Sequence, residues 1–139
     1  MDQLVQLIPV AEAVKILRNH QISPTQQRVV VAQALFVRDQ HLSADQVLDL
    51  VQLHGYRVSK ATIYNTLGLF ARKGLVKERV VDPTKVYYDT KVTPHQHFYN
   101  EDSGELIDIN QDLPPLTPSQ LPEGTRIDSV DVIIRLRNN

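Results

Sequence analysis

The chain has 139 residues, of which 42% are hydrophobic, and it contains no cysteine, so one or two small folded domains are expected and disulfides and thiolate zinc sites are excluded. No run approaches the roughly 20 apolar residues of a membrane span, and the start lacks a basic segment and a cleavage site, so a cytosolic protein is expected. The net charge of −1 is uneven, because residues 1–81 carry net +4 and residues 82–139 carry net −5. This asymmetry predicts two parts with different roles.

The first part of the chain has the pattern of successive helices with start and stop signals. Apolar residues at helical spacing predict a helix over residues 10–19. In ISPTQQRVVVAQALF, Ser23 is expected as the N-cap and Pro24 at the first helical position. Two further helices are expected in LSADQVLDLVQLHG and VSKATIYNTLGLFARKG, with caps and stops at Ser43 and Gly55 and at Ser59 and Gly74.

After Gly74 the hydrophobic period changes from helical to that of strands. The runs LVKERVV and KVYYD flank the turn DPT and predict a β-hairpin. Helices followed by a hairpin are the order of a winged helix-turn-helix, in which the last helix enters a DNA major groove and the hairpin touches the backbone. A winged-helix DNA-binding domain is therefore predicted over residues 1–89.

From residue 90 the pattern is mostly that of strands. QHFYNE and ELIDI flank the turn DSG, a proline-rich connector DLPPLTPSQLPEG follows, and RIDSVDVIIRLR predicts a last strand. Three strands in about 50 residues do not bury both faces of a sheet. A second copy of the chain is the expected packing partner, so a dimerisation domain is predicted over residues 90–139, and the histidines discussed below make it the candidate effector-binding domain.

The helix predicted in VSKATIYNTLGLFARKG carries polar residues that are suited to DNA binding. A helix N-terminus favours phosphate, tyrosine can contact a thymine methyl group, and asparagine can pair with adenine. The predicted DNA-binding residues are Arg57, Ser59, Lys60, Thr62, Tyr64 and Asn65. Further phosphate contacts are expected from Arg72, Lys73, Lys77 and Arg79. The alternative is an ordinary solvated helix with polar surface residues.

Two of the five histidines stand two residues apart in PHQHFY. In a strand His95 and His97 project from one face, about 7 Å apart at Cα. Imidazole suits zinc, iron, copper and nickel, and carboxylates such as Asp89 and Asp108 can complete a site for harder ions. The alternative is a surface histidine pair, and His41 alone is a weaker signal still.

Taken together, the motifs resemble the ferric uptake regulator superfamily over nearly the whole chain. The likeness rests on ISPTQQR, HLSADQVL, ATIYNTLGLFARKGLV and the HxH motif followed by a turn and ELIDI. The runs TKVYYDTKVTPHQHFY and IDSVDVIIRLR are most similar to the iron response regulator subfamily. The resemblance implies an α+β fold, with an N-terminal winged helix-turn-helix and a small C-terminal α/β dimerisation domain, working as a homodimer on a palindromic operator in double-stranded DNA.

The resemblance also implies a regulatory metal site between the two domains. Its ligands fall here on His41, Asp89, His95, His97 and Asp108, a set that suits Fe²⁺ or Mn²⁺ and also accepts Zn²⁺. Many relatives hold a structural zinc through paired CxxC motifs, which this chain lacks, so its dimer sheet is expected to depend on packing alone. Gln96 and the histidine-free connector predict one metal site per protomer.

The subfamily likeness adds haem as a competing effector, with His95 or His97 as axial ligand. An iron-responsive transcriptional regulator that senses haem or Fe is therefore the leading functional prediction, and a sensor of Mn²⁺, Zn²⁺ or peroxide is the nearest alternative. A DNA-binding module without an effector is a further alternative. A metal-dependent enzyme is not expected, because no positioned general base, nucleophile elbow or phosphate loop is found.

Overall fold

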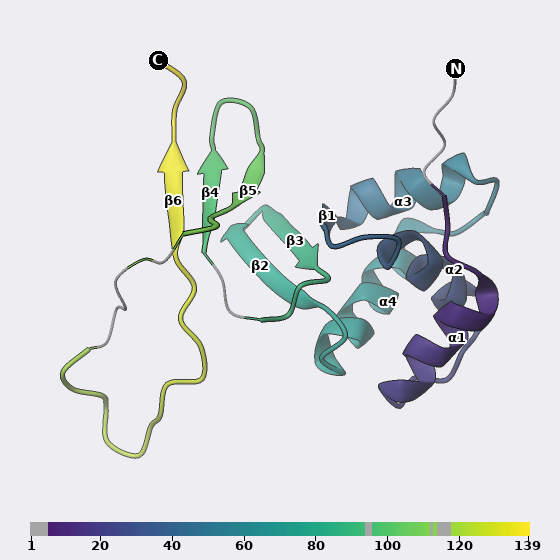
Figure 1. Ribbon diagram of the computed structural model, residues 1–139, viewed down its shortest axis with the longest axis horizontal. Helices are drawn as coiled ribbons and strands as arrows, with labels where there is room; N and C mark the ends of the chain where they lie inside the picture. The colour runs from purple at the N-terminus through teal and green to yellow at the C-terminus, as the bar shows by residue number, and fades with distance from the viewer. Residues whose placement is uncertain (1–5, 94–95, 112, 114–117) are drawn as a thin grey trace. The chain divides into compact units, whose positions relative to one another are not determined.

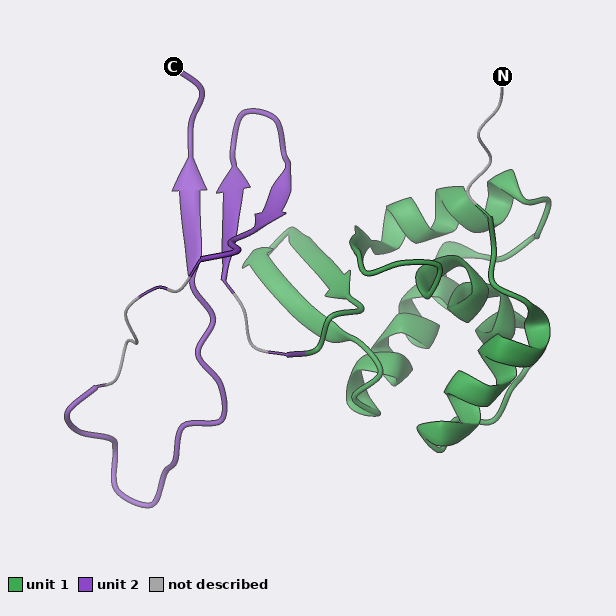
Figure 2. Ribbon diagram, viewed as in Figure 1, with its two compact units in different colours: residues 1–92 green, residues 93–139 purple. Residues whose placement is uncertain are grey.

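The computed structural model describes residues 6–93, 96–111, 113 and 118–139. The chain divides into two compact units, residues 1–92 and residues 93–139 (Figure 2). No helix in the described ranges combines the length and the apolar character that crossing a membrane requires.

The described residues of unit 1, from residue 6 onward, form four helices and a small sheet (Figure 1). Its elements in chain order are α1 (Val10–Asn19), α2 (Gln26–Leu35), β1 (His41–Ser43), α3 (Ala44–Leu53), α4 (Lys60–Arg72), β2 (Lys77–Asp82) and β3 (Lys85–Asp89). The four helices and the hairpin confirm the predicted winged-helix order. The helices pack around a common core of fully buried side chains, which includes Leu17, Leu35, Val47, Val51, Ile63, Leu67 and Phe70.

The helix starts follow the predicted caps in two cases and differ in one. Ser43 forms a capping box with Gln46, in which each side chain satisfies a backbone N–H of the other residue. Ser59 accepts a hydrogen bond from the backbone N–H of Thr62 at 3.1 Å. The prediction of Ser23 as a cap was wrong, because Thr25 remains extended and its hydroxyl accepts from the N–H of Arg28. Serine and threonine hydroxyls can both cap a helix, so the residue types alone do not decide between Ser23 and Thr25.

The wing is a three-stranded sheet of order β1-β3-β2, in which β3 pairs antiparallel with both neighbours. The predicted hairpin is confirmed, and Asp82 stabilises its turn by accepting from the N–H and hydroxyl of Thr84. The third strand, β1, was not predicted, because three residues are too few to show a period. Hydrogen bonds between Gln40 and Thr90 continue the pairing of β1 with β3.

Unit 2 contains β4 (His97–Asn100), β5 (Leu106–Asp108) and β6 (Ile133–Leu136). The sheet order is β5-β4-β6, with β4 antiparallel to β5 and parallel to β6. The last strand covers only four residues of the predicted run RIDSVDVIIRLR, because only these four pair with β4. The described part of unit 2 contains no helix.

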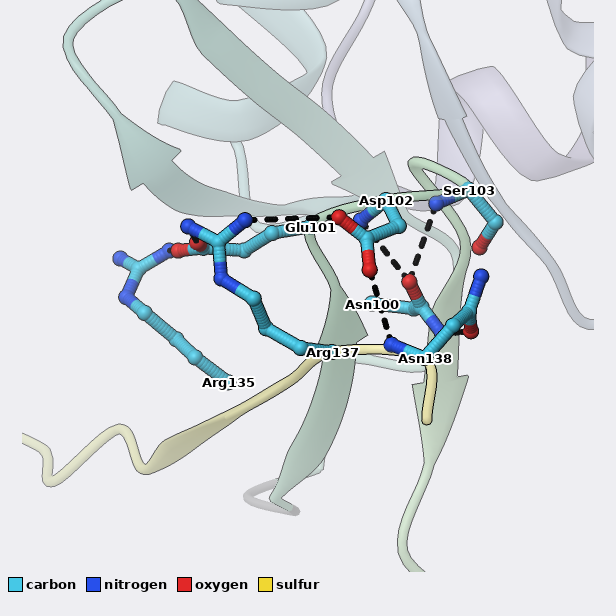
Figure 3. A network of polar contacts seen from close by, with 7 residues as sticks. All are labelled: Asn100, Glu101, Asp102, Ser103, Arg135, Arg137 and Asn138. Atoms are coloured by element: carbon cyan, nitrogen blue, oxygen red, sulfur yellow. Dashed lines mark hydrogen bonds and ion pairs between the residues drawn. The ribbon is translucent and has the colours of Figure 1, made fainter.

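A network of polar contacts joins the β4–β5 turn to the C-terminal strand (Figure 3). Asn100 accepts from the N–H groups of Asp102 and Ser103, and Asp102 accepts from the N–H of Asn138. Glu101 forms ion pairs with Arg135 and Arg137 at 3.3 and 2.8 Å. We call this group the turn clamp; its members are Asn100, Glu101, Asp102, Ser103, Arg135, Arg137 and Asn138. These polar contacts within the unit link the β4–β5 turn to the residues at and after β6, and the expected dependence of a dimer sheet on packing stays a prediction.

Candidate metal centre and nucleic-acid interface

Two of the predicted metal ligands occupy facing positions on neighbouring strands of the wing. The antiparallel pairing of β1 with β3 places His41 directly opposite Asp89, and residues opposite each other in such a pair have neighbouring side chains. The His41 ring lies edge-on to Tyr87, with the ring centroids 6.2 Å apart. The wing thus supplies one imidazole and one carboxylate. We call these two residues the wing pair.

The carboxylate of the wing pair is already engaged by other groups of unit 1. Arg79 Nε lies 3.3 Å from Asp89 Oδ2, and the N–H of Lys91 donates to Asp89 Oδ1 at 2.9 Å. The same guanidinium donates to the carbonyl of Lys91 at 3.2 Å. The side chains of Arg79 and Asp89 are 3% and 2% exposed, so this is a buried ion pair.

The prediction that Arg79 contacts phosphate was wrong, because this arginine is buried. A signal in the sequence did exist. In the strand KERVVD, Arg79 shares a face with Val81, which is also buried. A basic residue on the apolar face of a strand predicts a buried carboxylate partner, and only the fold identifies that partner as Asp89.

The other two described ligands meet in unit 2. The pairing of β4 with β5 places His97 opposite Asp108. His97 Nε2 lies 3.1 Å from Asp108 Oδ1; the histidine side chain is 3% exposed and the aspartate side chain 31%. Two ligand atoms that bind one ion at about 2.1 Å and at a right angle lie about 3 Å apart. These two residues, the sheet pair, therefore fit adjacent positions on a divalent metal.

The fifth predicted ligand, His95, lies outside the described residues, so the structure is informative for four of the five. The register alone brings these four together as two His–Asp pairs, one within each unit. Both pairs offer the nitrogen and oxygen donors that borderline-hard divalent ions accept. Neither pair is a complete site, because two ligands do not fill a tetrahedral or octahedral shell.

The predicted DNA-reading helix is α4 (Lys60–Arg72), and the six residues predicted to bind DNA on it and just before it differ in their contacts. Arg57, Tyr64 and Asn65 are exposed and make no cap contact, and Tyr64 is 45% exposed. Ser59 and Thr62 instead bond to each other, because the Ser59 hydroxyl accepts from the Thr62 N–H and donates to the Thr62 hydroxyl at 2.9 Å. These two side chains have a structural task at the start of the helix.

Lys60 has a partner that the sequence did not indicate. Its ammonium lies 3.0 Å from Asp45 of α3 and 5.9 Å from the centre of the Tyr64 ring. The hydrogen bond and the negative charge of Asp45 raise the pKa of Lys60. Both side chains are mostly exposed, so this ion pair is weak in water and can exchange for a phosphate.

A hollow of about 430 Å³ lies between the start of α2 and α4. Gln27 and Arg28 line it from α2, and Asn65 and Arg72 line it from α4. Sequence reasoning missed Gln27 and Arg28, because no local pattern shows that the first turn of α2 lies beside the reading helix. Amide and guanidinium groups next to Asn65 are suited to contacts with base edges and phosphates.

A winged-helix unit with an exposed polar helix defines a DNA-binding protein of the helix-turn-helix class. The family model of the ferric uptake regulator family matches residues 19–134, so the chain belongs to this family. The members of the family are transcription regulators and not enzymes, and they bind DNA as dimers. The chain is therefore a transcription regulator of this family.

Known regulators share part of their sequence with this chain. The chain is 28% identical over 99 residues to the peroxide-responsive repressor PerR of Staphylococcus saprophyticus and equally identical to the peroxide operon regulator of Bacillus subtilis. Each match covers 71% of this chain and 67% or 68% of the relative, so it spans about two thirds of these regulators.

Two solved structures extend the likeness in fold. The ferric uptake regulator of Pseudomonas aeruginosa with manganese has a TM-score of 0.66 at 22% identity, covering 89% of this chain and 96% of that chain. The regulator Fur of Vibrio cholerae has a TM-score of 0.68 at 16% identity, covering 90% of this chain and 98% of that chain. The predicted likeness to iron response regulators in particular stays a prediction.

Proposed function

We propose that the protein is a repressor that binds operator DNA as a homodimer and responds to one divalent metal ion per protomer. The observation that carries this proposal is the sheet pair, whose ligand atoms lie 3.1 Å apart at the spacing of neighbouring metal ligands. The relatives named for peroxide response and the manganese-containing neighbour support a metal-linked function. A dimer on DNA predicts a palindromic operator.

The proposed ligands are the wing pair, the sheet pair and His95. Three neutral imidazoles and two carboxylates give a donor set of charge −2, which balances a divalent ion. This mixture suits Fe²⁺ or Mn²⁺ and accepts Zn²⁺. Metal binding shifts the protein toward the arrangement of the dimer for which the ion has the higher affinity.

Arg57, Lys60, Tyr64 and Asn65 are proposed to contact DNA directly. Ser59 and Thr62 contribute by fixing the start of α4, where free N–H groups favour a phosphate. Charged contacts with phosphates release counterions, so operator affinity should fall steeply as salt rises. A flat salt dependence would argue against Lys60 and its basic neighbours as backbone contacts.

Peroxide is the second candidate signal, and the names of the two curated relatives favour it. In this version peroxide transfers one oxygen atom to a ligand imidazole, with water as the other product. The oxidised ring is a poorer ligand, so the metal and then the DNA are released. Mass spectrometry of the peptides that contain His41 and His97 after peroxide treatment detects this product directly.

Haem is the effector implied by the likeness to iron response regulators. None of the relatives named above is described as a haem protein, and axial ligation through Nε2 of His97 requires this atom to leave Asp108. Haem and a divalent ion therefore compete for the same histidine. Because the two effectors compete, one titration experiment can identify which of them changes operator binding.

The test measures operator binding by fluorescence anisotropy under anaerobic conditions, with a DNA duplex selected from random sequence by the protein. Metal-stripped protein is titrated separately with Mn²⁺, Fe²⁺, Zn²⁺ and haem. We expect one divalent ion to change affinity at least tenfold, about 1.4 kcal/mol of coupling. A specific response to haem alone would replace the metal proposal with the haem-sensing one.

The matched variants are His97→Ala and His20→Ala. His20 ends α1, where its ring contacts the carbonyl of Ile16, and it belongs to neither pair. His97→Ala should abolish the response to the ion, whereas His20→Ala should respond like the wild type. A normal response of His97→Ala would remove the sheet pair from the proposed site.

A further inference from the structure

The buried ion pair of Arg79 with Asp89 is unusual for a proposed metal ligand. Both side chains are almost fully buried, and the guanidinium is fixed at its other end by the carbonyl of Lys91. The second carboxylate oxygen accepts from the N–H of Lys91. The carboxylate thus accepts from two groups of unit 1, and one of them carries a permanent positive charge.

This positive charge changes the charge balance of the proposed site. The donor set alone carries −2 from its two carboxylates, and Arg79 reduces the local charge to −1. A carboxylate has about four lone-pair positions, so a metal can still bind Asp89 beside the arginine. Two cations on one buried carboxylate repel each other, and the repulsion is strong where water is excluded. The number of uncompensated negative ligands is a main determinant of metal affinity.

Resting on the proposed function, we propose that Arg79 is a built-in counter-charge that competes with the metal ion for Asp89 and sets a high metal threshold. Without metal, Arg79 neutralises a carboxylate that would otherwise be buried and uncompensated. The wing therefore keeps its structure in the metal-free protein. With metal, the ion must bind against the guanidinium, so a higher concentration of free ion is needed.

The alternative is that Arg79 only orients Asp89 as a metal ligand. Outer partners that fix a metal ligand usually strengthen metal binding, and their loss weakens it. The two roles therefore predict opposite signs for the same substitution. This difference makes the affinity for metal the decisive measurement.

The experiment measures Mn²⁺ affinity of the full-length protein by competition with a chromogenic chelator, and the melting temperature with and without Mn²⁺. The principal variant is Arg79→Gln, which removes the charge but keeps an N–H donor for Asp89. Arg79→Lys keeps the charge. Lys85→Met removes one positive charge from the other end of the hairpin, where the side chain is exposed, and is the matched control.

Arg79→Gln should bind Mn²⁺ at least tenfold more tightly than the wild type, and Mn²⁺ should raise its melting temperature further than that of the wild type. Arg79→Lys and Lys85→Met should stay within about threefold of the wild type, because each keeps the charge beside Asp89. Equal or weaker binding by Arg79→Gln overturns the inference. If this variant is unfolded without metal, Mn²⁺ should restore its helical circular dichroism, and failure to do so also overturns the inference.

His97→Ala separates this inference from the proposed function. If His97→Ala loses Mn²⁺ binding while Arg79→Gln binds as the wild type does, the metal site stands and only the competing role of Arg79 fails. If the wild type and His97→Ala bind Mn²⁺ equally or not at all, the proposed site fails, and competition at Asp89 fails with it.

Discussion

The two small sheets of this protein each place a histidine opposite an aspartate, but they bury opposite members of the pair. In the wing pair Asp89 is buried and compensated by Arg79. In the sheet pair His97 is 3% exposed, whereas Asp108 is 31% exposed and can be solvated. The same cross-strand pairing therefore gives one carboxylate that is fully buried beside an internal cation and one that is partly exposed. Only the first is expected to be important for folding in the absence of metal.

The largest expected effect comes from deleting the two aspartates in metal-free protein. Asp89→Ala leaves the guanidinium of Arg79 buried without its carboxylate, which should lower the free energy of unfolding by about 3–5 kcal/mol. Asp108→Ala removes a partly solvated group, so its effect should stay below about 1 kcal/mol. Urea denaturation followed by circular dichroism measures both. Equal losses for the two variants would break the contrast between the pairs.

A double variant identifies why Asp89→Ala lowers the free energy of unfolding. Arg79→Met combined with Asp89→Leu replaces both charges by apolar side chains, and such replacements of buried ion pairs are often neutral. The double variant should therefore recover most of the stability that Asp89→Ala loses. A double variant as unstable as the single one would show that packing, and not the unpaired charge, dominates at this position.

A smaller effect is expected from the turn clamp, which belongs to unit 2 alone. Asn100→Ala removes the acceptor for the N–H groups of Asp102 and Ser103 and should destabilise this turn by about 1 kcal/mol. Amide hydrogen exchange should accelerate at β6 and the turn while the helices of unit 1 keep their protection. Accelerated exchange throughout α1 to α4 would contradict a role confined to unit 2.

Most of the secondary structure could be predicted from the sequence, because caps, stops and periods are local signals. The helix over residues 10–19, the capping box at Ser43 and both hairpins are examples. β1 and the length of β6 could not be predicted, because each is defined by pairing with a strand far away in the chain. The N-cap of α2 was misplaced by two residues between equivalent hydroxyl groups.

The candidate site was predictable in its residue types and not in its electrostatics. The spacing of His95 and His97 and the family resemblance pointed to the ligands. The family resemblance implies no arginine at the site, so the sequence alone predicts Arg79 as a phosphate contact on the surface. Only the fold places it beside Asp89. The Lys60–Asp45 pair was missed for the same reason, since α3 and α4 meet only in the folded protein.

The smallest expected effect tests the charge contrast between the basic first part and the acidic second part. Asp45 is an acidic exception on the proposed DNA face, where it holds the ammonium of Lys60 at 3.0 Å. Asp45→Asn releases this ammonium for a phosphate and removes a negative charge, so operator affinity should rise roughly two- to fivefold. The effect should shrink as salt rises, because exposed charges are screened.

Asp49→Asn is the matched control for Asp45→Asn. It removes the same charge from an exposed position of the same helix, one turn further from Lys60. If both variants gain equally, the gain reflects net charge and not the release of Lys60. If Asp45→Asn alone gains, and Lys60→Met abolishes this gain, the ion pair between α3 and α4 limits DNA affinity. Both variants change the net charge of the first part of the chain by the same amount. A difference in operator affinity between them therefore shows that the position of a charged side chain beside α4, and not the net charge, determines DNA binding.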